Sequence, residues 1–242
     1  MKLSERMKKY ESVQKQFLMA KTPAIIRLDG KAFHTWTRNL EKPFDANFYA
    51  AMAQTTVNLV NSIQGAVFAY GQSDEISIFI KDYTNFDTDA WFGGNIQKIV
   101  SVSASIATAN FNSYAERLGI SNNNLALFDS RVFTLPPHEV SNYFIWRQED
   151  FHRNSVRMVA HEYLGHKACE HRNSQDLVND LRNMDTPIDW YRDYEDVYRR
   201  GYCFIRGADS VNVNVPVFKE CLDFINVHVQ SSFYSEDTEA TP

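Results

Sequence analysis

The chain has 242 residues, of which 44% are hydrophobic, 14% aromatic and 23% charged. This length and composition predict a globular protein with one sizeable core, or one core and a small second lobe, and argue against disorder. The net charge of −5 argues against a protein that coats nucleic acid without specificity, although it permits a local basic groove.

Cysteine usage and apolar runs narrow the class of protein further. Cys169, Cys203 and Cys221 are too few and too widely spaced for a disulfide framework or a four-ligand zinc site, so we expect buried free thiols in a reducing compartment. The sequence has no apolar core of signal-peptide length and no apolar run of about 18 residues that could span a membrane. We therefore expect a cytoplasmic protein with a loose acidic tail over residues 230–242.

The first part of the chain is predicted to contain two helices and a short strand. A helix over residues 3–20 precedes a buried strand over residues 24–28, which ends at Asp29-Gly30. Apolar residues then recur at helical spacing over residues 45–63, after Asp45 as a plausible N-cap.

Two more strands and a long helix follow. The strands over residues 66–70 and 75–80 flank the sequence GQSD and therefore predict a β-hairpin. The second strand carries isoleucines on one side and Ser77 and Phe79 on the other. A helix over residues 91–117 is rich in Ala and Ser, which suggests close packing on a sheet, and a strand over residues 126–135 comes after it.

This order of elements predicts the fold class. Strand, helix, strand, strand, helix, strand is the βαββαβ arrangement of ferredoxin-like domains. After residue 138 the pattern is mostly helical, with a final strand over residues 202–205. We predict an α+β protein with a palm-like catalytic domain over residues 1–137, and a helical region over residues 138–229 that is packed on it and continuous with it.

Two carboxylates stand at the strand ends of this arrangement. Asp29 ends the first strand and Asp74 lies at the tip of the hairpin, and a βαββαβ domain places these strands side by side. Converging carboxylates repel each other unless a cation joins them, and such hard oxygen ligands suit magnesium. Each segment alone is more readily explained as a turn, but their matched positions favour a site for two-metal phosphoryl transfer.

The residues after Asp29 add candidate phosphate contacts. Gly30 has no Cβ, so the backbone can approach an ion or a phosphate closely. The N–H groups of the next four residues are expected to form an anion cradle; these residues are Lys31, Ala32, Phe33 and His34. Lys42 and Ser73 are further candidates for phosphate contacts.

Six ordered segments resemble the motifs of one family. They are RLDGKAFH (residues 27–34), KPFD (42–45), YGQSDE (70–75), DSRV (129–132), WRQED (146–150) and YRRG (198–201). Together they resemble the tRNA-histidine guanylyltransferases and their like-proteins, over roughly residues 20–206.

The resemblance implies a polymerase-palm fold with additional C-terminal helices, and nucleotide addition in the 3′-to-5′ direction at the 5′ end of tRNA. It implies ATP, GTP and other nucleoside triphosphates as substrates, a homotetramer, and two magnesium ions held by Asp29, the Gly30 carbonyl and Asp74, with Glu75 as a supporting catalytic residue. The residues that it implies for nucleotide binding are Asp29, Gly30, Lys31, Ala32, Phe33, His34, Lys42, Asp45, Ser73 and Asp74.

One segment departs from the family pattern. Enzymes dedicated to tRNA-histidine carry HINNLYN where this chain has HRNSVRM, which keeps only His152 and Asn154 of the motif's first residues. This departure favours the like-protein branch, which fills in missing 5′ nucleotides against a template and repairs truncated tRNAs. A guanylyltransferase specific for tRNA-histidine is the alternative; a nucleotide cyclase on the same palm and a non-catalytic tRNA-binding protein are more distant ones.

Basic and polar residues are candidates for contacts to tRNA or a triphosphate, although a solvated helical face explains many of them equally well. They are Arg27, Arg131, Arg147, His152, Arg153, Asn154 and Lys167. His161 and His166 superficially resemble a zinc-protease pair. A five-residue step on a helix would turn the two side chains about 140° apart, so we expect no zinc site.

Overall fold

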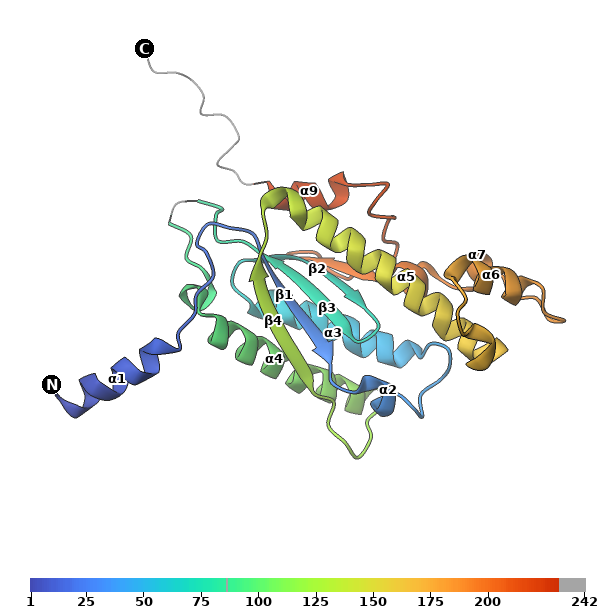
Figure 1. Cartoon of the computed structure of the whole chain (residues 1–242), viewed down its shortest axis with the longest axis horizontal. Coiled ribbons are helices and arrows are strands. Elements are labelled where there is room, and N and C mark those ends of the chain that lie inside the picture. The colour runs from blue at the N-terminus through green and yellow to red at the C-terminus, as the bar shows by residue number, and fades with distance from the viewer. Residues whose placement is uncertain (86, 231–242) are drawn as a thin grey trace, which may run out of the picture.

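The computed structural model describes residues 1–85 and 87–230, and a five-stranded antiparallel sheet forms its centre (Figure 1). The strands are β1 (Ala24–Gly30), β2 (Ala66–Gln72), β3 (Glu75–Ile80), β4 (Phe128–Thr134) and β5 (Tyr202–Ile205). Their spatial order is β4-β1-β3-β2-β5. With helices α3 (Ala46–Ser62) and α4 (Ile96–Arg117), the first four strands confirm the predicted βαββαβ order.

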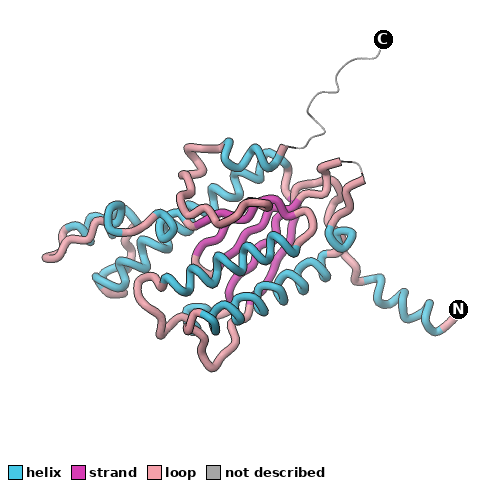
Figure 2. Tube along the Cα trace, turned by 180° about the vertical axis from the view of Figure 1, so that it is seen from behind, coloured by secondary structure: helices cyan, strands magenta, loops and turns pink. Residues whose placement is uncertain are grey.

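Helices cover both faces of this sheet. Ile76 and Ile78 of β3 belong to the apolar cluster that includes α3 and α4, and Figure 2 shows two helices running across that face. Phe79 points the other way, into a second cluster with residues of α5 (Val140–Leu164) and α9 (Asp223–Val229). The predicted alternation in this strand is therefore confirmed, because successive side chains of a strand face opposite layers.

Local sequence features fix α3 and α4 in place. Asp45 caps α3, since its carboxylate accepts a 2.8 Å hydrogen bond from the N–H of Phe48. Small residues let α4 approach the sheet closely: Ser103 and Ser130 of β4 share a hydrogen bond of 2.8 Å, and Ala107 is fully buried. The predicted N-cap of α3 and the predicted close packing of α4 on the sheet are both confirmed.

Two predicted helix boundaries are wrong because the segment after α1 and the segment before α4 pair with each other through their backbones. Helix α1 (Leu3–Val13) ends well before residue 20, because the following segment pairs with residues 94–96 through the Leu18 N–H and the Ile96 N–H. The long helix does not begin at residue 91. A 3₁₀ turn, Trp91–Gly94, precedes it, and Asn95 then caps α4 by accepting from the Lys98 N–H.

The strand predicted over residues 126–135 is also shorter than expected, since the side chain of Asn112 forms hydrogen bonds with the backbone of Ala126.

The second half of the described chain is mainly helical, as predicted, and β5 pairs with β2. Its remaining helices are α6 (Ser174–Arg182), α7 (Trp190–Asp193) and α8 (Asp196–Arg200), while the short α2 (Phe33–Trp36) belongs to the first half. The division at residue 137 stays a prediction, and the predicted acidic tail lies outside the described residues except for residue 230.

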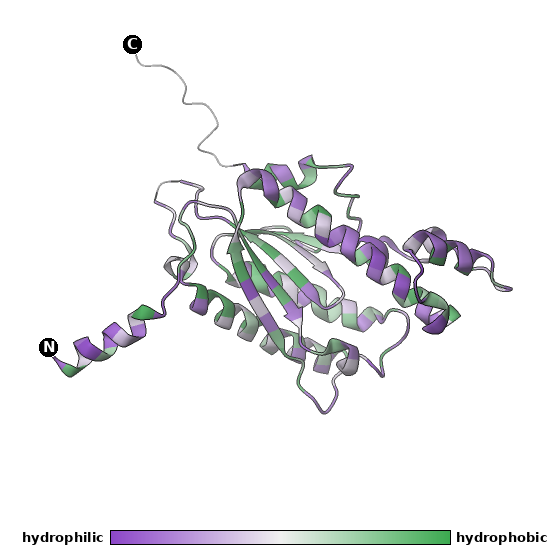
Figure 3. Cartoon of the chain, viewed as in Figure 1, coloured by the Kyte–Doolittle hydropathy of each residue, from purple (hydrophilic) through white to green (hydrophobic). Residues whose placement is uncertain are grey.

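Burial of the remaining apolar and sulfur-containing residues is uneven. Cys169 and Cys203 are buried, but Cys221 is exposed, so the prediction of a buried thiol is wrong there. Helix α1 buries none of its residues, and Figure 3 shows it projecting from the body with polar and apolar residues mixed along it. Over residues 1–85 and 87–230, no helix combines the length and apolar character that a bilayer span requires.

Candidate active site

The two predicted carboxylates meet where β1 and the β2–β3 hairpin end. Asp29 lies beside Glu75 in the register of β1 and β3, and the Gly30 N–H donates a 3.1 Å hydrogen bond to the backbone carbonyl of Asp74. Backbone pairing therefore brings together residues that are far apart in the sequence, as the βαββαβ order predicted.

Burial and mutual repulsion raise the pKa of both carboxyl groups. Burial and the charge of Asp29 raise the pKa of Asp74 from 3.8 to about 6, and burial with the charge of Glu75 raises the pKa of Asp29. A divalent cation between the two groups would remove this repulsion. In the described part of the chain, no three His, Cys, Asp or Glu side chains converge as a metal cage. A magnesium ion would therefore need other oxygens too, such as those of substrate phosphates.

Gly30 has a packing reason as well as the predicted one. A Cβ at this position would lie 2.3 Å from the ring of Phe33, which packs against Trp36, Phe111 and Phe128. The turn after it requires a left-handed backbone at Ala32, where φ is +55°. The chain can fold back this tightly only because Gly30 carries no side chain.

The predicted anion cradle stays a prediction, and three of its four N–H groups have no acceptor among the described residues. The Lys31 N–H donates to the carbonyl of Leu127 at 2.8 Å, so the prediction is wrong for this group. In the part of the chain that the structure describes, no acceptor pairs with the N–H groups of Ala32, Phe33 and His34. These three residues also line a cleft. Free backbone donors beside a cleft are suited to binding phosphate oxygens.

This larger cleft has a volume of about 610 Å³ and gathers most residues predicted to bind the nucleotide. Those lining it are Gly30, Ala32, Phe33, His34, Lys42, Asp45, Ser73 and Asp74. Lys42 also donates from its ammonium to the carbonyl of Thr37 at 2.9 Å. Lys31 is exposed and lies outside the lining.

A smaller cleft of about 190 Å³ lies on the other side of Asp74. Its lining includes Arg27, Asp29 and Asn154, and it shares Ser73, Asp74 and Met158 with the larger cleft. Asp74 therefore stands between two adjoining spaces. This arrangement suits an enzyme that brings together two phosphate-bearing substrates.

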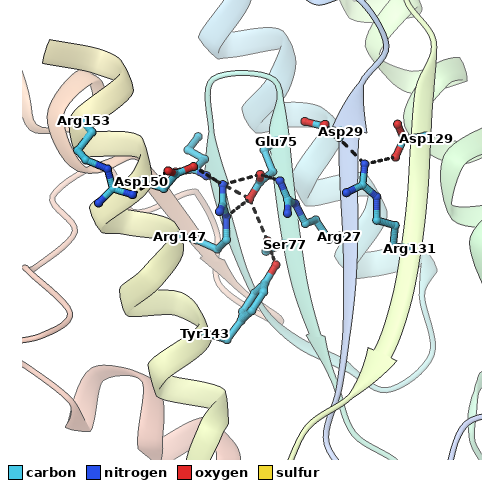
Figure 4. A network of polar contacts seen from close by, with 11 residues as sticks. Arg27, Asp29, Glu75, Ser77, Asp129, Arg131, Tyr143, Arg147, Asp150 and Arg153 are labelled. Atoms are coloured by element: carbon cyan, nitrogen blue, oxygen red, sulfur yellow. Dashed lines mark hydrogen bonds and ion pairs between the residues drawn. The ribbon is translucent and has the colours of Figure 1, made fainter. Parts of the chain in front are cut away.

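Glu75 is held in place by two arginines (Figure 4). Arg147 of α5 donates to its two oxygens at 2.7 Å and 2.9 Å, and Arg27 of β1 lies 2.6 Å from the second oxygen. Glu75 is only 5% exposed and Arg147 only 4% exposed. Arg147 also lines the smaller cleft, but its guanidinium is buried and occupied, and its predicted contact with tRNA or a triphosphate stays a prediction. Its bonds fix α5 against the strands that carry the aspartates.

The network continues on both sides of Glu75. Asp150 accepts from Arg147 and from Arg153, each at 2.9 Å, while Arg131 lies 3.2 Å from Asp129 and 3.9 Å from Asp29. Figure 4 shows this row of charges crossing from α5 over the sheet to β4. Asp150 belongs to the WRQED segment, but its role as a bridge could not be inferred from that motif.

The predicted RNA contacts do not form one surface. Arg27 and Asn154 line the smaller cleft, whereas His152 and Arg153 line a separate cavity beside Trp190. Lys167 is exposed and outside the lining of all these spaces. Helix periodicity explains the split, because residues two positions apart on α5 point in different directions.

His161 and His166 lie close together, contrary to the prediction. Their ring centroids are 4.0 Å apart, and both residues line the larger cleft. The predicted divergence assumed one continuous helix, but α5 ends at Leu164 and Gly165, with φ of +79°, redirects the chain. Phe44, Tyr49 and Met158 also line this cleft. Phe44 stands in the KPFD segment, whereas nothing in the sequence spacing marks Tyr49 or Met158 as a site residue.

Comparison with known proteins identifies the family. A family model described as tRNAHis guanylyltransferase (Thg1) matches residues 4–136, more than half of the chain. The chain belongs to this family. Its members are tRNA guanylyltransferases, so this Thg1-family protein is a nucleotidyltransferase.

Solved structures support the assignment to the Thg1 family. A bacterial tRNA(His) guanylyltransferase-like protein in complex with ATP is 40% identical, with a TM-score of 0.89 over 94% of this chain and 99% of that chain. A bacterial like-protein in complex with GTP is 37% identical, with a TM-score of 0.79 over 94% and 98%. The Saccharomyces cerevisiae enzyme is 21% identical, with a TM-score of 0.74 over 88% and 97%, and shows the shared fold.

Curated relatives are more distant in sequence. An uncharacterized protein of Acanthamoeba polyphaga mimivirus is 30% identical over 211 residues, which is 78% of this chain and 72% of that protein. The tRNA(His) guanylyltransferase of Debaryomyces hansenii is 31% identical over 159 residues, which covers 63% of this chain and 57% of that enzyme. These matches agree with the Thg1 family assignment.

Proposed function

We propose that this Thg1-family protein is a template-dependent 3′–5′ nucleotidyltransferase that adds nucleotides to the 5′ end of tRNA, including truncated tRNA. The observation that carries the proposal is the position of Asp74, which lines both adjoining clefts, with Asp29 in the lining of the smaller one. The larger cleft would take the incoming nucleoside triphosphate, and the smaller one would take the 5′ end of the tRNA. The likeness to bacterial proteins in complex with ATP and GTP supports the proposal that this chain binds a nucleoside triphosphate.

The nucleotide would be held mainly by the backbone. The N–H groups of Ala32, Phe33 and His34 can donate to its phosphate oxygens, and the Ser73 hydroxyl lies at the boundary between the clefts. Lys42 and Asp45 are the proposed contacts for the rest of the molecule.

The residues present suit magnesium. Asp29 and Asp74 supply two carboxylates whose pKa values are raised by burial and by neighbouring negative charge, a repulsion that a cation would offset, and Gly30 supplies a carbonyl at the same strand end. Bound magnesium would lower the pKa of an attacking hydroxyl and neutralise phosphate charge. Glu75, fixed by Arg27 and Arg147, would hold these ligands in position.

The proposed reaction has two routes. A tRNA that begins with a monophosphate would first be adenylylated: its phosphate oxygen attacks the α-phosphorus of ATP and pyrophosphate leaves. The 3′ hydroxyl of the incoming nucleotide then attacks the activated 5′ phosphorus, and the bond to AMP breaks. A triphosphorylated end would skip activation and release pyrophosphate. Arg27 and Asn154 line the smaller cleft and are placed to orient the 5′ phosphate.

A guanylyltransferase specific for tRNA-histidine is the second candidate, favoured by the description of the matching family model. Templated repair is preferred because residues 152–158 read HRNSVRM in place of the HINNLYN of dedicated enzymes. The greater likeness to the bacterial like-proteins than to the Saccharomyces cerevisiae enzyme agrees with this choice.

The test uses a labelled tRNA that lacks its first nucleotides. With ATP, the four nucleoside triphosphates and magnesium, the wild type should extend it until the 5′ strand is complete. Asp29→Ala and Asp74→Ala should abolish extension, whereas Asp209→Ala, which removes an exposed carboxylate after β5, should not. Absence of extension by the wild type, or equal extension by both active-site variants, would refute the proposal.

Two further arms separate the alternatives. If the protein adds only guanosine, and only to tRNA-histidine, the specific guanylyltransferase is correct. If it converts ATP or GTP alone to a cyclic product, it is a cyclase.

Assembly and location are also proposals. The exposed apolar side chains Leu3, Met7, Tyr10 and Val13 of α1 support burial of this helix in the homotetramer implied by the family resemblance. Sedimentation analysis of the full chain should give the mass of four copies. We propose the cytoplasm as its location.

A further inference from the structure

A third cavity lies apart from both clefts, between α5 and the segment that contains α7 and α8. Its volume is about 540 Å³, and it shares no lining residue with the two clefts beside Asp74. The side chains that matter for its chemistry are His152, Arg153, Trp190, Tyr191, Arg199 and Arg200.

The charge of this cavity favours an anion. Three arginines line it, and the one carboxylate among its lining residues, Glu149, lies 3.7 Å from the ammonium of Lys219. Burial, with the positive charges of Arg153 and Arg199, lowers the pKa of His152. The imidazole therefore lies near positive charge, and the three arginines share two carboxylate partners outside the lining, Asp150 for Arg153 and Asp196 for Arg199 and Arg200.

Two buried donors in the lining have no acceptor within the described residues. They are the Nε of Arg199, whose side chain is 16% exposed, and the Nε1 of Trp190, which is fully buried. Both atoms are shielded from solvent, so the donors more accessible to a ligand are the guanidinium groups of Arg153 and Arg200, whose side chains are 55% and 33% exposed. Tyr191 is 48% exposed beside them and offers an aromatic ring to a flat ligand.

We propose that this cavity binds a backbone phosphate of the tRNA substrate, with a neighbouring base against Tyr191, at a distance from the metal-binding aspartates. The inference rests on the proposed function, since it assigns a second contact for the same RNA. A free nucleoside triphosphate offers the same phosphate chemistry. RNA fits better because no pair of carboxylates lines this cavity to hold the magnesium ion that accompanies a triphosphate.

The cavity is connected to the active site through one shared carboxylate. Asp150 accepts from Arg153, which lines the cavity, and from Arg147, which holds Glu75. Replacing Arg153 therefore removes a phosphate contact but also changes a neighbour of the catalytic network. Arg200, which pairs with Asp196 at 3.3 Å, provides a second variant without that connection.

The test measures binding of a labelled, 5′-truncated tRNA to the full chain at several salt concentrations, in EDTA and without nucleotides. Arg153→Gln and Arg200→Gln should each weaken binding several-fold and reduce the slope of log K against log salt by about 0.7–0.9, as expected for one lost phosphate contact. Arg117→Gln, at an exposed arginine of α4, should change neither quantity. In the extension assay, the two cavity variants should raise the KM for tRNA, and Arg117→Gln should keep the wild-type KM and kcat.

The proposal would be overturned if Arg153→Gln and Arg200→Gln both bound tRNA with the affinity and the salt dependence of the wild type. It would also fail if the variants lost a binding site for ATP or inorganic pyrophosphate while tRNA binding stayed unchanged, since the cavity would then bind free phosphates. A wild type that binds tRNA with this arginine dependence but never extends it would refute the proposed function and leave the binding site standing.

Discussion

Asp74→Asn should stabilise the metal-free protein at pH 7 while abolishing nucleotide addition. The folded chain raises the pKa of Asp74 from 3.8 to about 6, because the carboxyl group is buried and lies near Asp29. Protonation is therefore easier in the folded state than in the unfolded state. The contribution of Asp74 to the stability of the folded state is therefore largest below pH 4. This contribution is lost as the pH rises towards and through 6. Asparagine keeps the shape and removes the charge.

The size of the effect follows from the pKa change. A rise from 3.8 to about 6 corresponds to an upper bound of about 3 kcal/mol at about 1.4 kcal/mol per pKa unit. Partial exposure of the side chain reduces this value, so we expect a gain of about 1–3 kcal/mol at pH 7. For a chain of this size, such a gain should raise Tm by roughly 3–9 °C.

Thermal unfolding followed by circular dichroism in EDTA, from pH 4 to pH 8, provides the measurement. The Tm difference between Asp74→Asn and wild type should be small at pH 4 and largest above pH 6. Magnesium should then stabilise only the wild type, because a ligand that binds the folded state raises its stability. Asp209→Asn, at an exposed position, is the control. A variant that is less stable than wild type at pH 7, or a difference that does not depend on pH, would show that Asp74 is not electrostatically strained.

Three other substitutions or conditions test the site. Arg147→Gln should lower the free energy of unfolding by about 3–5 kcal/mol in urea, because it leaves the buried Glu75 short of a partner. Gly71→Ala should lower it by roughly 1–3 kcal/mol, since its Cβ would lie 2.2 Å from the ring of Tyr202. Magnesium affinity measured by calorimetry should fall about tenfold for each pH unit below 6, because protonated Asp74 is a poor ligand.

Each of these expectations has a contrary outcome. If the free energy of unfolding of Arg147→Gln lies within about 1 kcal/mol of the wild-type value, the pair contributes no more than a surface ion pair does. Water would then replace the lost guanidinium. Wild-type stability of Gly71→Ala would place the Tyr202 ring elsewhere. If the magnesium affinity does not change between pH 5 and pH 7, then Asp74 either is not a ligand or does not have a raised pKa.

Much of the central sheet follows from local sequence. Alternating residues in β3, the cap at Asp45 and the hairpin residues before Glu75 each depend on a few neighbouring positions. The order of strands and helices then placed Asp29 and Asp74 together, since few topologies accommodate that order. The family motifs supplied the proposed chemistry.

Helix ends were harder to predict, because distant backbone groups decide them. The segment after Val13 has helical residues but pairs with the carbonyl of Gly94 and the N–H of Ile96. Gly165 turned the chain after α5 and brought His161 and His166 together, against a prediction made from helix periodicity alone. Propensity is outweighed wherever tertiary hydrogen bonds compete for the same backbone.

The sequence by itself determined the order of the elements along the chain, the metal-binding candidates Asp29 and Asp74, and the family. Only the tertiary structure decided which charged side chains are buried in ion pairs and which line a cavity. Arg147 and Glu75 are separated by 72 residues, yet they form a buried pair, whereas Arg153 six residues later faces another cavity. Periodicity and motifs report on a residue and its near neighbours, while burial and pairing depend on what the folded chain places against it.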